Sequence, residues 1–500
     1  MNPLYTRAEI RAAEMAAAQQ LAPGTLMQRA GLAGANVARA LLPAAPAQYK
    51  VLVLAGPGNN GGDALETAAH LADAGLQVSV WLLPDTGAPS EERRHALQRA
   101  RASDATFIEA TPAALARADW NLVVDGLFGI GLRRPLDGVA LAAVEQLNRQ
   151  HCPVLALDVP SGLDADTGAV VGPDAVAVRA SHTVTFIGDK PGLHTGDGRD
   201  HAGAVQVAPL DIDARHLAPA RARLNDASHF AQHLRARRQN THKGSYGSVA
   251  VVGGAHGMTG APILAARSAL FGGAGRVYLA FPDEAPAYDS GQPELMCRLA
   301  GDFDFDTAVL VAGPGLGTSH RAYALLQRAI DSSSALVLDA DALNLMAAEP
   351  ELQSALSLRP GGALLTPHPL EAARLLGVTI AEVQGDRLAA ARQLAAQMQV
   401  TVILKGSGTV VAAADGAVVV NTTGNPGLAT AGTGDVLSGL CGSLLAQGWP
   451  QWQAALAAVW LHGAAADALV AAGVGPIGLT ASELLPAIRG AINRMARSGT

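Results

Sequence analysis

The first half of the chain places polar side chains directly after a series of strand-like apolar runs. They are Asn59, Asn60 and Asp63; Asp125; Asp158 and Ser161; and Lys190. Ligands of open parallel sheets sit outside the carboxyl ends of the strands, so we expect these side chains to converge. Their oxygen atoms could transfer protons or bind a cation.

The segment VLVLAGPGNNGGD, residues 51–63, joins a buried-strand run to a glycine-rich turn. Such glycines let backbone N–H groups approach a phosphate or sugar closely. Gly56, Gly58 and Gly61 also spell the G-x-G-x-x-G pattern of hydride-transfer folds. Asp63 argues against that interpretation, because a carboxylate in the first helical turn would repel a pyrophosphate seated there.

Three charged residues of this half have competing interpretations. Asp125, in VVDGLFGIGLRRPL, suits a catalytic carboxylate or a cation ligand, but it could simply cap a helix or turn. The same two interpretations apply to Asp158 in LALDVPSGLDADTG. Lys190 follows a strand end but could be an ordinary surface lysine.

The second half contains a motif suited to phosphoryl transfer. Gly432, Thr433, Gly434 and Asp435 stand at the expected start of a helix. Backbone amides there can stabilise phosphate charge, and the carboxylate can take a proton from an attacking hydroxyl, as in a ribokinase-like site. The alternative is a tight turn with a helix-stabilising carboxylate. No G-x-x-x-x-G-K-[ST] run occurs, which excludes an ordinary P-loop.

Other motifs of the second half support the phosphoryl-transfer interpretation. VILKGSGTVV gives a strand, Lys405 and a glycine turn suited to nucleotide phosphates. TPHPLEAARLLG places His368 at a strand end, although His368 could equally be a core or loop histidine. GPGLG adds another glycine-rich strand end, and LVLDADALN adds Asp339, Asp341 and Asn344.

Composition limits the class of protein. Five hundred residues with 49% hydrophobic content predict two or three domains with proper cores. A net charge of -7 gives no basic field for nucleic acid, and residues 235–238 are interpreted as a basic linker feature. Cys152, Cys297 and Cys441 share no metal-ligand spacing. A cytoplasmic location without membrane attachment is expected, since residues 7–14 predict an amphipathic helix and residues 454–479 a core helix and loop.

Strand-like runs alternate with helical patterns, which predicts α/β domains with mainly parallel sheets. The expected strands of the first half are 51–54, 78–82, 122–124, 154–157 and 183–187, and a new strand at 248–252 opens the second half. Strand character is lost between about Pro209 and His242. We therefore expect domains at 1–215 and 235–500 with a linker at 216–234.

The first half resembles the epimerase domain of the bifunctional NAD(P)H-hydrate repair enzymes. The resemblance covers most of residues 1–215 and rests on GPGNNGGD, VVDGLFGIG, LALDVPSGLDADTG and TFIGDKPGL. It implies a Rossmann-like three-layer parallel sheet and epimerisation at the hydroxylated C6 of damaged NADH or NADPH. The substrate-binding residues that it implies are Gly58, Asn59, Asn60, Gly61, Gly62, Gly129, Ile130, Gly131, Leu132, Arg133, Arg134, Pro135, Asp158 and Lys190.

The resemblance also implies a potassium ion held by Asn60, Asp125 and Ser161. All three supply oxygen, as a hard cation prefers. We hypothesise that Asp125 also handles the proton that opens and recloses the hydrated ring. One departure from the family pattern is Ala64, where a third glycine commonly follows the aspartate.

The second half resembles the ADP-dependent NAD(P)H-hydrate dehydratases over about residues 235–495, and implies a ribokinase-like α/β domain. The C6 hydroxyl of the S hydrate would be phosphorylated by ADP and phosphate eliminated, with magnesium present and AMP released. Asp435 would be the base. The nucleotide would contact Lys405, Gly406, Ser407, Gly408, Thr409, Gly432, Thr433 and Gly434, and the hydrate Ala261, Gly315, His368 and Asp435, with Asp341 and Asn425 as further candidates for magnesium or phosphate.

Two alternatives stay open. The chain could be a small-molecule kinase with an accessory N-terminal domain, or its first half could be a non-catalytic interaction or nucleotide-sensing module. The expected partners are the hydrates of NADH and NADPH together with ADP. A homo-oligomer is also expected, because packed α/β domains commonly assemble symmetrically.

Overall fold

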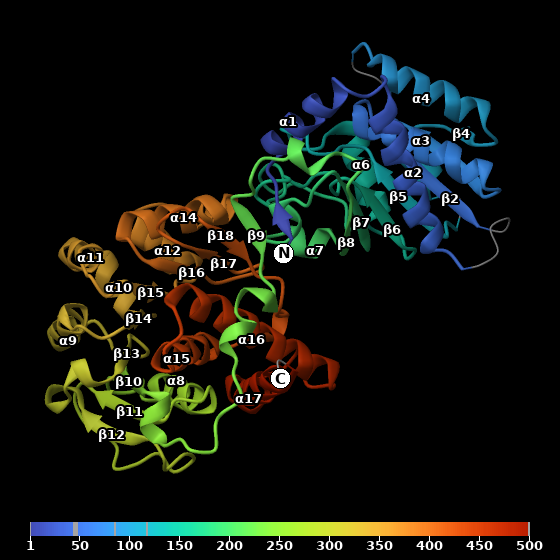
Figure 1. The fold of residues 1–500 in the computed structure, drawn as a ribbon. Helices are drawn as coiled ribbons and strands as arrows, with labels where there is room; N and C mark the ends of the chain where they lie inside the picture. The colour runs from blue at the N-terminus through green and yellow to red at the C-terminus, as the bar shows by residue number, and fades with distance from the viewer. Residues whose placement is uncertain (1, 44–48, 85–86, 117–118, 499–500) are drawn as a thin grey trace. The chain divides into compact units, whose positions relative to one another are not determined.

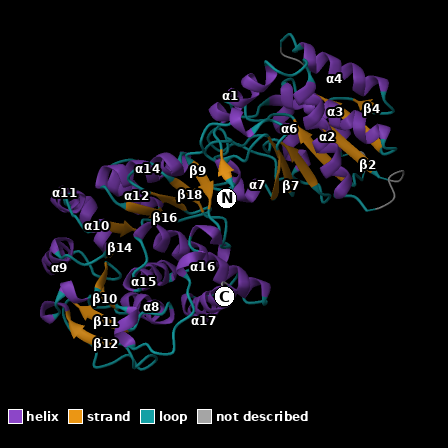
Figure 2. Ribbon diagram, viewed as in Figure 1, coloured by secondary structure: helices purple, strands orange, loops and turns teal. Residues whose placement is uncertain are grey.

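The computed structural model describes residues 2–43, 49–84, 87–116 and 119–498. It divides the chain into two compact units, Asn2–Arg223 and Leu224–Thr500 (Figure 1). Both units contain parallel sheets with helices packed on them (Figure 2). The α/β class expected from the sequence is therefore confirmed.

The first unit is built on a seven-stranded sheet in the order β4-β3-β2-β5-β6-β7-β8. Every neighbouring pair in it is parallel. Its strands are β2 (Lys50–Ala55), β3 (Gln77–Leu82), β4 (Thr106–Ile108), β5 (Leu122–Gly126), β6 (Val154–Leu157), β7 (His182–Phe186) and β8 (Ala204–Ala208). The short strands β1 (Pro3–Leu4) and β9 (Ala222–Leu224) pair antiparallel.

Helices cover both faces of this sheet. Val51 and Val53 of β2 join one apolar cluster, while Leu52 and Leu54 join another. Alternate residues of a strand point to opposite faces, so the clusters mark two cores and a three-layer unit. The helices are α1 (Arg7–Ala18), α2 (Thr25–Ala40), α3 (Asn59–Asp73), α4 (Glu91–Ala102), α5 (Pro112–Leu115), α6 (Gly138–Leu147) and α7 (Gly198–His201), with 3-10 turns at Pro191–Leu193 and Ala214–His216.

In the second unit the strand order is β18-β17-β16-β15-β14-β13-β10-β11-β12. Pairing is parallel from β16 to β12 and antiparallel among β16, β17 and β18. The strands are β10 (Ser248–Val252), β11 (Arg276–Phe281), β12 (Met296–Leu299), β13 (Val309–Ala312), β14 (Leu336–Leu338), β15 (Ala363–Leu365), β16 (Thr401–Leu404), β17 (Val410–Ala412) and β18 (Val418–Val420).

The helices of the second unit pack on its sheet and on one another. They are α8 (Gly260–Phe271), α9 (His320–Asp331), α10 (Asp341–Ala348), α11 (Pro350–Ser357), α12 (Pro369–Leu376), α13 (Ile380–Gly385), α14 (Arg387–Met398), α15 (Thr433–Ala446), α16 (Gln451–Ala471) and α17 (Ala481–Ser498). Short 3-10 turns occur at Ala227–His229, Ala231–His233, Lys243–Tyr246, Ala300–Asp302, Phe305–Thr307 and Pro426–Leu428.

Three features of the core bear on the sequence analysis. Phe230 and Leu234 belong to the core of the second unit, so part of the expected linker is packed structure. Helix α16 is long and apolar enough to cross a membrane by length and composition, and most of it is buried inside the unit. Cys152, Cys297 and Cys441 are free thiols, and Cys441 is fully buried in the core.

Candidate functional sites

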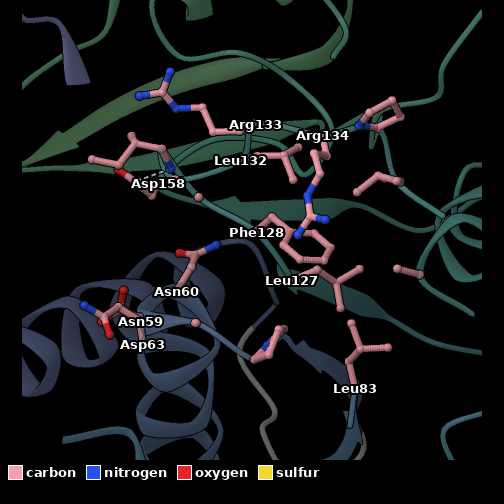
Figure 3. A pocket seen from close by; sticks show the side chains of 18 of the residues that line it. Asn59, Asn60, Asp63, Leu83, Leu127, Phe128, Leu132, Arg133, Arg134 and Asp158 are labelled. Atoms are coloured by element: carbon pink, nitrogen blue, oxygen red, sulfur yellow. Dashed lines mark hydrogen bonds between the residues drawn. The ribbon is translucent and has the colours of Figure 1, made fainter. Parts of the chain in front are cut away.

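A cavity of about 1430 Å³ lies at the carboxyl ends of β2 and β5 in the first unit. Figure 3 shows Asn59, Asn60 and Asp63 of α3 on one side of it and Leu132, Arg133 and Arg134 on the other. The residues expected from the sequence that line it are Gly58, Asn59, Asn60, Gly129, Ile130, Gly131, Leu132, Arg133, Arg134, Pro135 and Asp158. Residues that follow three strands, β2, β5 and β6, therefore form one pocket.

The remaining expected residues of this half lie behind the cavity wall. Gly61 and Gly62 face inward, toward the backbone of Gly56 and the side chain of Met27. Gly129 has no room for a side chain, because a Cβ there would lie 3.0 Å from Asp158 Oδ2 and 3.2 Å from Asn60 Cγ. At Gly61, Gly62 and Gly129 the backbone packs closely against these neighbours, which favours a residue without a side chain.

Asp125, the last residue but one of β5, has a fully buried carboxylate. One oxygen, Oδ1, accepts from Ser161 Oγ at 2.7 Å and from Leu127 N at 3.2 Å, while Oδ2 accepts from Ser161 N at 2.8 Å. Burial raises the pKa of Asp125 to about 6, and the bonds from Ser161 and Leu127 oppose that rise. The bond to Leu127 is a local turn contact, as the turn-capping interpretation of Asp125 expects.

Asp158 and Lys190 form a buried ion pair. Lys190 is fully buried, and its ammonium donates to Asp158 Oδ1 at 2.6 Å, to Thr185 Oγ1 at 2.7 Å and to the Phe186 carbonyl at 2.8 Å. The interpretation of Lys190 as a surface lysine is therefore wrong. All three donors of the ammonium are used, so Lys190 orients Asp158 from behind. Asp158 itself has φ 65°, an uncommon left-handed conformation for a residue other than glycine.

Asn60 provides an observation that fits a cation. Both polar atoms of its side chain are buried, and neither has a hydrogen-bond partner. A buried amide without partners is costly and rare in native proteins, which points to a bound group. Asn60, Asp125 and Ser161 all offer oxygen, as potassium requires. The chemistry of these donors therefore fits the expected ion.

Sequence reasoning did not place helix α1 in this site. Arg11, Glu14 and Met15 of α1 line the cavity. Burial raises the pKa of Glu14, with Asp158 adding to the effect. Burial also raises the pKa of Asp63, together with Asp158 and Glu14. The expected amphipathic helix gave no signal for this role, because the cavity forms only when distant segments pack together.

In the second unit, helix α15 begins at the glycine-rich motif. Gly432 caps it with φ 88°, a conformation that favours glycine. The first amides of a helix have no partner within the helix, so they can bind an anion. Asp435 stands in the first turn. Burial raises its pKa to about 7, Asp339 adds to this, and Lys405 opposes it.

Lys405 connects this helix start to a cluster of acids. Its ammonium lies 2.9 Å from Asp339 Oδ1, 4.0 Å from Glu371 Oε2 and 3.2 Å from where a Cβ of Gly434 would stand. Burial lowers the pKa of Lys405, but the carboxylates of Asp339 and Glu371 outweigh it and the net shift is upward. The nucleotide loop and the anion-binding helix expected from the sequence thus meet at Lys405.

His368 and Glu371 form the start of α12. Nδ1 of His368 accepts from the amides of Leu370 and Glu371, and Glu371 Oε2 accepts from His368 N at 2.7 Å. The ring is partly exposed, so a core role is excluded, and capping fixes its orientation. Burial raises the pKa of Glu371 to about 7, with Lys405 opposing. Glu371 was not among the site residues expected from the sequence.

The other expected residues of the second half occupy different positions. Ala261 and Gly315 are neighbours, since a Cβ on Gly315 would lie 3.4 Å from Ala261 Cβ. Asp341 Oδ2 accepts from Gly317 N at 2.9 Å. Asn425 is already engaged, donating to Asp467 at 2.9 Å and accepting from Gly427 N at 3.0 Å. These hydrogen bonds fix the conformation of the residues that precede α15.

The described part of the chain contains no group of three His, Cys, Asp or Glu side chains that could hold a metal ion. Magnesium commonly binds through one or two carboxylates and the phosphates of a nucleotide. A magnesium ion carried by a nucleotide therefore fits the second site better than an all-protein cage would.

Arg387 supports the loop that follows β16. It is almost fully buried, and Nη2 donates to the carbonyls of Leu404 at 3.2 Å and Lys405 at 3.1 Å. Burial lowers its pKa to about 10. Arg93 supports the corresponding loop of the first unit, donating through Nε and Nη2 to the carbonyl of Gly56 at 3.1 and 2.8 Å.

Comparison with known proteins gives matches to both halves. Residues 23–192 match the family described as YjeF-related protein N-terminus, and residues 249–489 match NAD(P)H-hydrate dehydratase. The bifunctional NAD(P)H-hydrate repair enzyme of Coxiella burnetii is 38% identical over 99% of this chain and 100% of that protein. The enzyme of the same name from Escherichia coli is 37% identical over 94% of this chain and 89% of that protein.

Two further matches concern the second half. The ADP-dependent (S)-NAD(P)H-hydrate dehydratase of Neisseria meningitidis is 46% identical over 55% of this chain and 95% of that protein. A crystal structure of the ADP/ATP-dependent NAD(P)H-hydrate dehydratase of Bacillus subtilis, co-crystallised with ATP and Mg2+, is 29% identical. The match covers 53% of this chain and 97% of the Bacillus subtilis chain, with a TM-score of 0.46.

Proposed function

The chain belongs to the family of bifunctional NAD(P)H-hydrate repair enzymes, and from the two sites we propose how it divides the repair between its units. The first unit interconverts the R and S forms of hydrated NADH and NADPH. The second unit dehydrates the S form at the expense of ADP, which gives NAD(P)H, AMP and phosphate. The observation that carries this proposal is Asp435 in the first turn of α15, beside Lys405, with a pKa near 7.

In the second unit, Asp435 takes the proton of the C6 hydroxyl as its oxygen attacks the β-phosphorus of ADP, and the bond to the AMP oxygen breaks. The amides of Gly432, Thr433 and Gly434 stabilise the charge on the phosphoryl oxygens, and Lys405 adds a positive charge. The ring nitrogen then expels phosphate from C6 and a proton leaves C5, which restores the double bond.

We propose that the loop Lys405–Thr409 holds the nucleotide, and that Ala261, Gly315 and His368 contact the hydrate. Nδ1 of His368 caps α12, Nε2 lies 3.4 Å from Glu371 Oε1, and the ring is partly exposed. Magnesium would arrive with the nucleotide and neutralise phosphate charge.

In the first unit, the proposed base is Asp125. It removes the proton of the C6 hydroxyl, and the bond from C6 to the ring nitrogen breaks as the nitrogen accepts a proton, which leaves an aldehyde at C6. The nitrogen then attacks either face of this aldehyde, loses its proton, and the new C6 hydroxyl oxygen is protonated. The walls of the pocket are Gly58 to Asn60, Gly129 to Pro135 and Asp158. Lys190 does not contact the hydrate itself but holds Asp158 in its orientation. Potassium, held by Asn60, Asp125 and Ser161, would supply positive charge beside the buried carboxylate.

The test uses a mixture of R and S NADH hydrates with ADP and magnesium, and follows the absorbance of reduced nicotinamide. Wild type should restore all of it. Asp125→Asn should restore promptly only the S fraction, while Asp435→Asn should restore none. Dehydration by Asp435→Asn at the wild-type rate would disprove the base assignment. A stable phosphorylated product made from ATP would support the small-molecule kinase instead.

We also propose that the protein is cytoplasmic and forms a homo-oligomer. Burial of most of α16 within the second unit supports the first statement. Sedimentation velocity of the full chain tests the second, and a single species at the monomer mass would contradict it.

A further inference from the structure

Helix α1 presents two different faces within the first unit. Ile10, Ala13 and Ala17 are buried against the core. Arg11, Glu14 and Met15 line the large cavity. Residues three and four positions apart share one face of a helix, so the second set forms a wall of the pocket by virtue of its spacing.

The position of α1 is fixed by hydrogen bonds at its start. Thr6 and Glu9 form a reciprocal capping box. The amide of Arg7 donates to Asp166 Oδ1 at 2.6 Å, and the amide of Tyr5 donates to the carbonyl of Asp189 at 2.8 Å. These bonds and the buried face hold Arg11 in a defined place at the cavity.

Arg11 lies over the loop that lines the opposite side of the site. Its Nη2 is 3.4 Å from the position that a Cβ of Gly131 would take. Gly129, two residues earlier, abuts Asp158 and Asn60. Arg11 therefore contacts the same short loop whose Gly129 packs against the two polar side chains of the proposed reaction centre.

The cavity contains three arginines, Arg11, Arg133 and Arg134. Within the described ranges, no ion pair or hydrogen bond joins the guanidinium of any of them to another residue. The acids facing the same space are Glu14, Asp63, Asp137 and Asp158. Asp158 pairs with Lys190, and burial raises the pKa values of Glu14 and Asp63, with Arg11 opposing the rise at Glu14.

We propose that Arg11 of α1 binds the phosphate next to the nicotinamide ribose of the dinucleotide hydrate. This inference rests on the proposed epimerase function. A guanidinium offers paired donors that match phosphate oxygens. The phosphate nearest the nicotinamide ribose is the first anionic group that lies beyond the reacting ring. That phosphate is common to NADH and NADPH hydrates, so Arg11 serves both substrates equally.

The experiment compares Arg11→Gln, Arg11→Lys and Arg94→Gln in the full-length protein. Arg94 is an exposed arginine of α4 that does not line the cavity and serves as the matched control. The epimerase KM for both dinucleotide hydrates should rise about 10- to 100-fold in Arg11→Gln, since a charged hydrogen bond is lost, with kcat little changed. Arg11→Lys should recover part of the loss.

Shortened substrates locate the contact. The hydrate of reduced nicotinamide mononucleotide should show the same increase in KM, while the hydrate of reduced nicotinamide riboside, which lacks phosphate, should not distinguish Arg11→Gln from wild type. An equal loss with the riboside would show a structural role for Arg11. A loss confined to NADPH hydrate would place Arg11 at the 2′-phosphate, and either result overturns the proposal.

Binding of NADH, measured by calorimetry, separates this inference from the proposed function. Weaker binding in Arg11→Gln than in wild type supports the phosphate contact whether or not epimerisation is observed. An active wild-type epimerase whose NADH affinity does not change on Arg11→Gln would contradict the inference alone.

Discussion

At the scale of single residues, the two proposed bases should titrate in different pH ranges. Burial raises the pKa of Asp125 to about 6 and that of Asp435 to about 7. A general base works only when ionised, so each reaction should slow as the pH falls through the pKa of its carboxylate. Epimerisation should therefore tolerate mild acid better than dehydration does.

The first prediction concerns Ser161→Ala. The Ser161 hydroxyl donates to the ionised form of Asp125, so its loss should raise the pKa of Asp125 by about one unit. The acidic limb of the epimerase pH profile should then move to higher pH. Dehydration by the same chain is the internal control. A profile that keeps its wild-type position would show that the hydroxyl does not control this titration.

The second prediction concerns the pH dependence of dehydration itself. The rate on S NADH hydrate should fall about tenfold per pH unit well below the pKa of Asp435. Asp331→Asn, which changes an exposed carboxylate at the end of α9, should leave both the rate and the profile as in wild type. A rate independent of pH across this range would argue against Asp435 as the base.

Site residues that stand in recognisable motifs could be predicted from the sequence. The residues that pack against them from other segments could not. Asn60 and Asp158 stand in selective glycine-rich segments, and the structure brings them to one cavity. Glu371 and Arg11 gave no such signal, because a capping glutamate and a surface arginine look the same in any helix. Their roles depend on Lys405 and Gly131, which are distant in sequence.

At the scale of elements, buried arginines stabilise the loops that carry ligands. Arg387 donates to the carbonyls of Leu404 and Lys405, and Arg93 donates to that of Gly56. Loops rich in glycine lose much conformational freedom on folding, so such fixed donors are needed to define their shape.

A third prediction follows for Arg387→Lys. Arg387 donates to both carbonyls through Nη2 and to Gln384 Oε1 through Nη1. A lysine has one nitrogen in place of this planar pair, so the loop Lys405–Thr409 should become less ordered. The KM for ADP should rise more than kcat falls, and the free energy of unfolding in urea should drop by about 1.5–3 kcal/mol. Arg321→Gln, at an exposed ion pair, is the control and should be close to neutral. An unchanged KM for ADP would show that the loop is held by other contacts.

The strands that were predicted correctly are those with continuous apolar runs. Residues 51–54 became β2, Lys50–Ala55, and 154–157 became β6 without change. Strands β4 and β8, which lie at the two edges of the sheet, were not among the strands expected from the sequence. Both are short, and several of their side chains are exposed or half-buried, so the apolar signal of a covered strand is absent.

At the scale of the whole molecule, each unit has its own core and its own site. The fourth prediction is that Asp125→Asn and Asp435→Asn complement one another when mixed. The first variant should dehydrate S hydrate that the second has produced, so the mixture should restore all the absorbance from an R and S mixture. Either variant alone should leave at least the R fraction unrepaired on the same timescale. Failure of the mixture would mean that the hydrate passes between sites of one chain.

The burial of Cys441 gives this protein an intrinsic reporter of transient opening. Burial raises the pKa of its thiol, so it should not react with an alkylating reagent while the second unit stays closed. Its labelling rate would measure how often that core opens, and ADP should slow the labelling because the nucleotide binds only the closed form. Cys152 in the first unit is partly exposed, so it should react without such opening, and ADP should not change its rate.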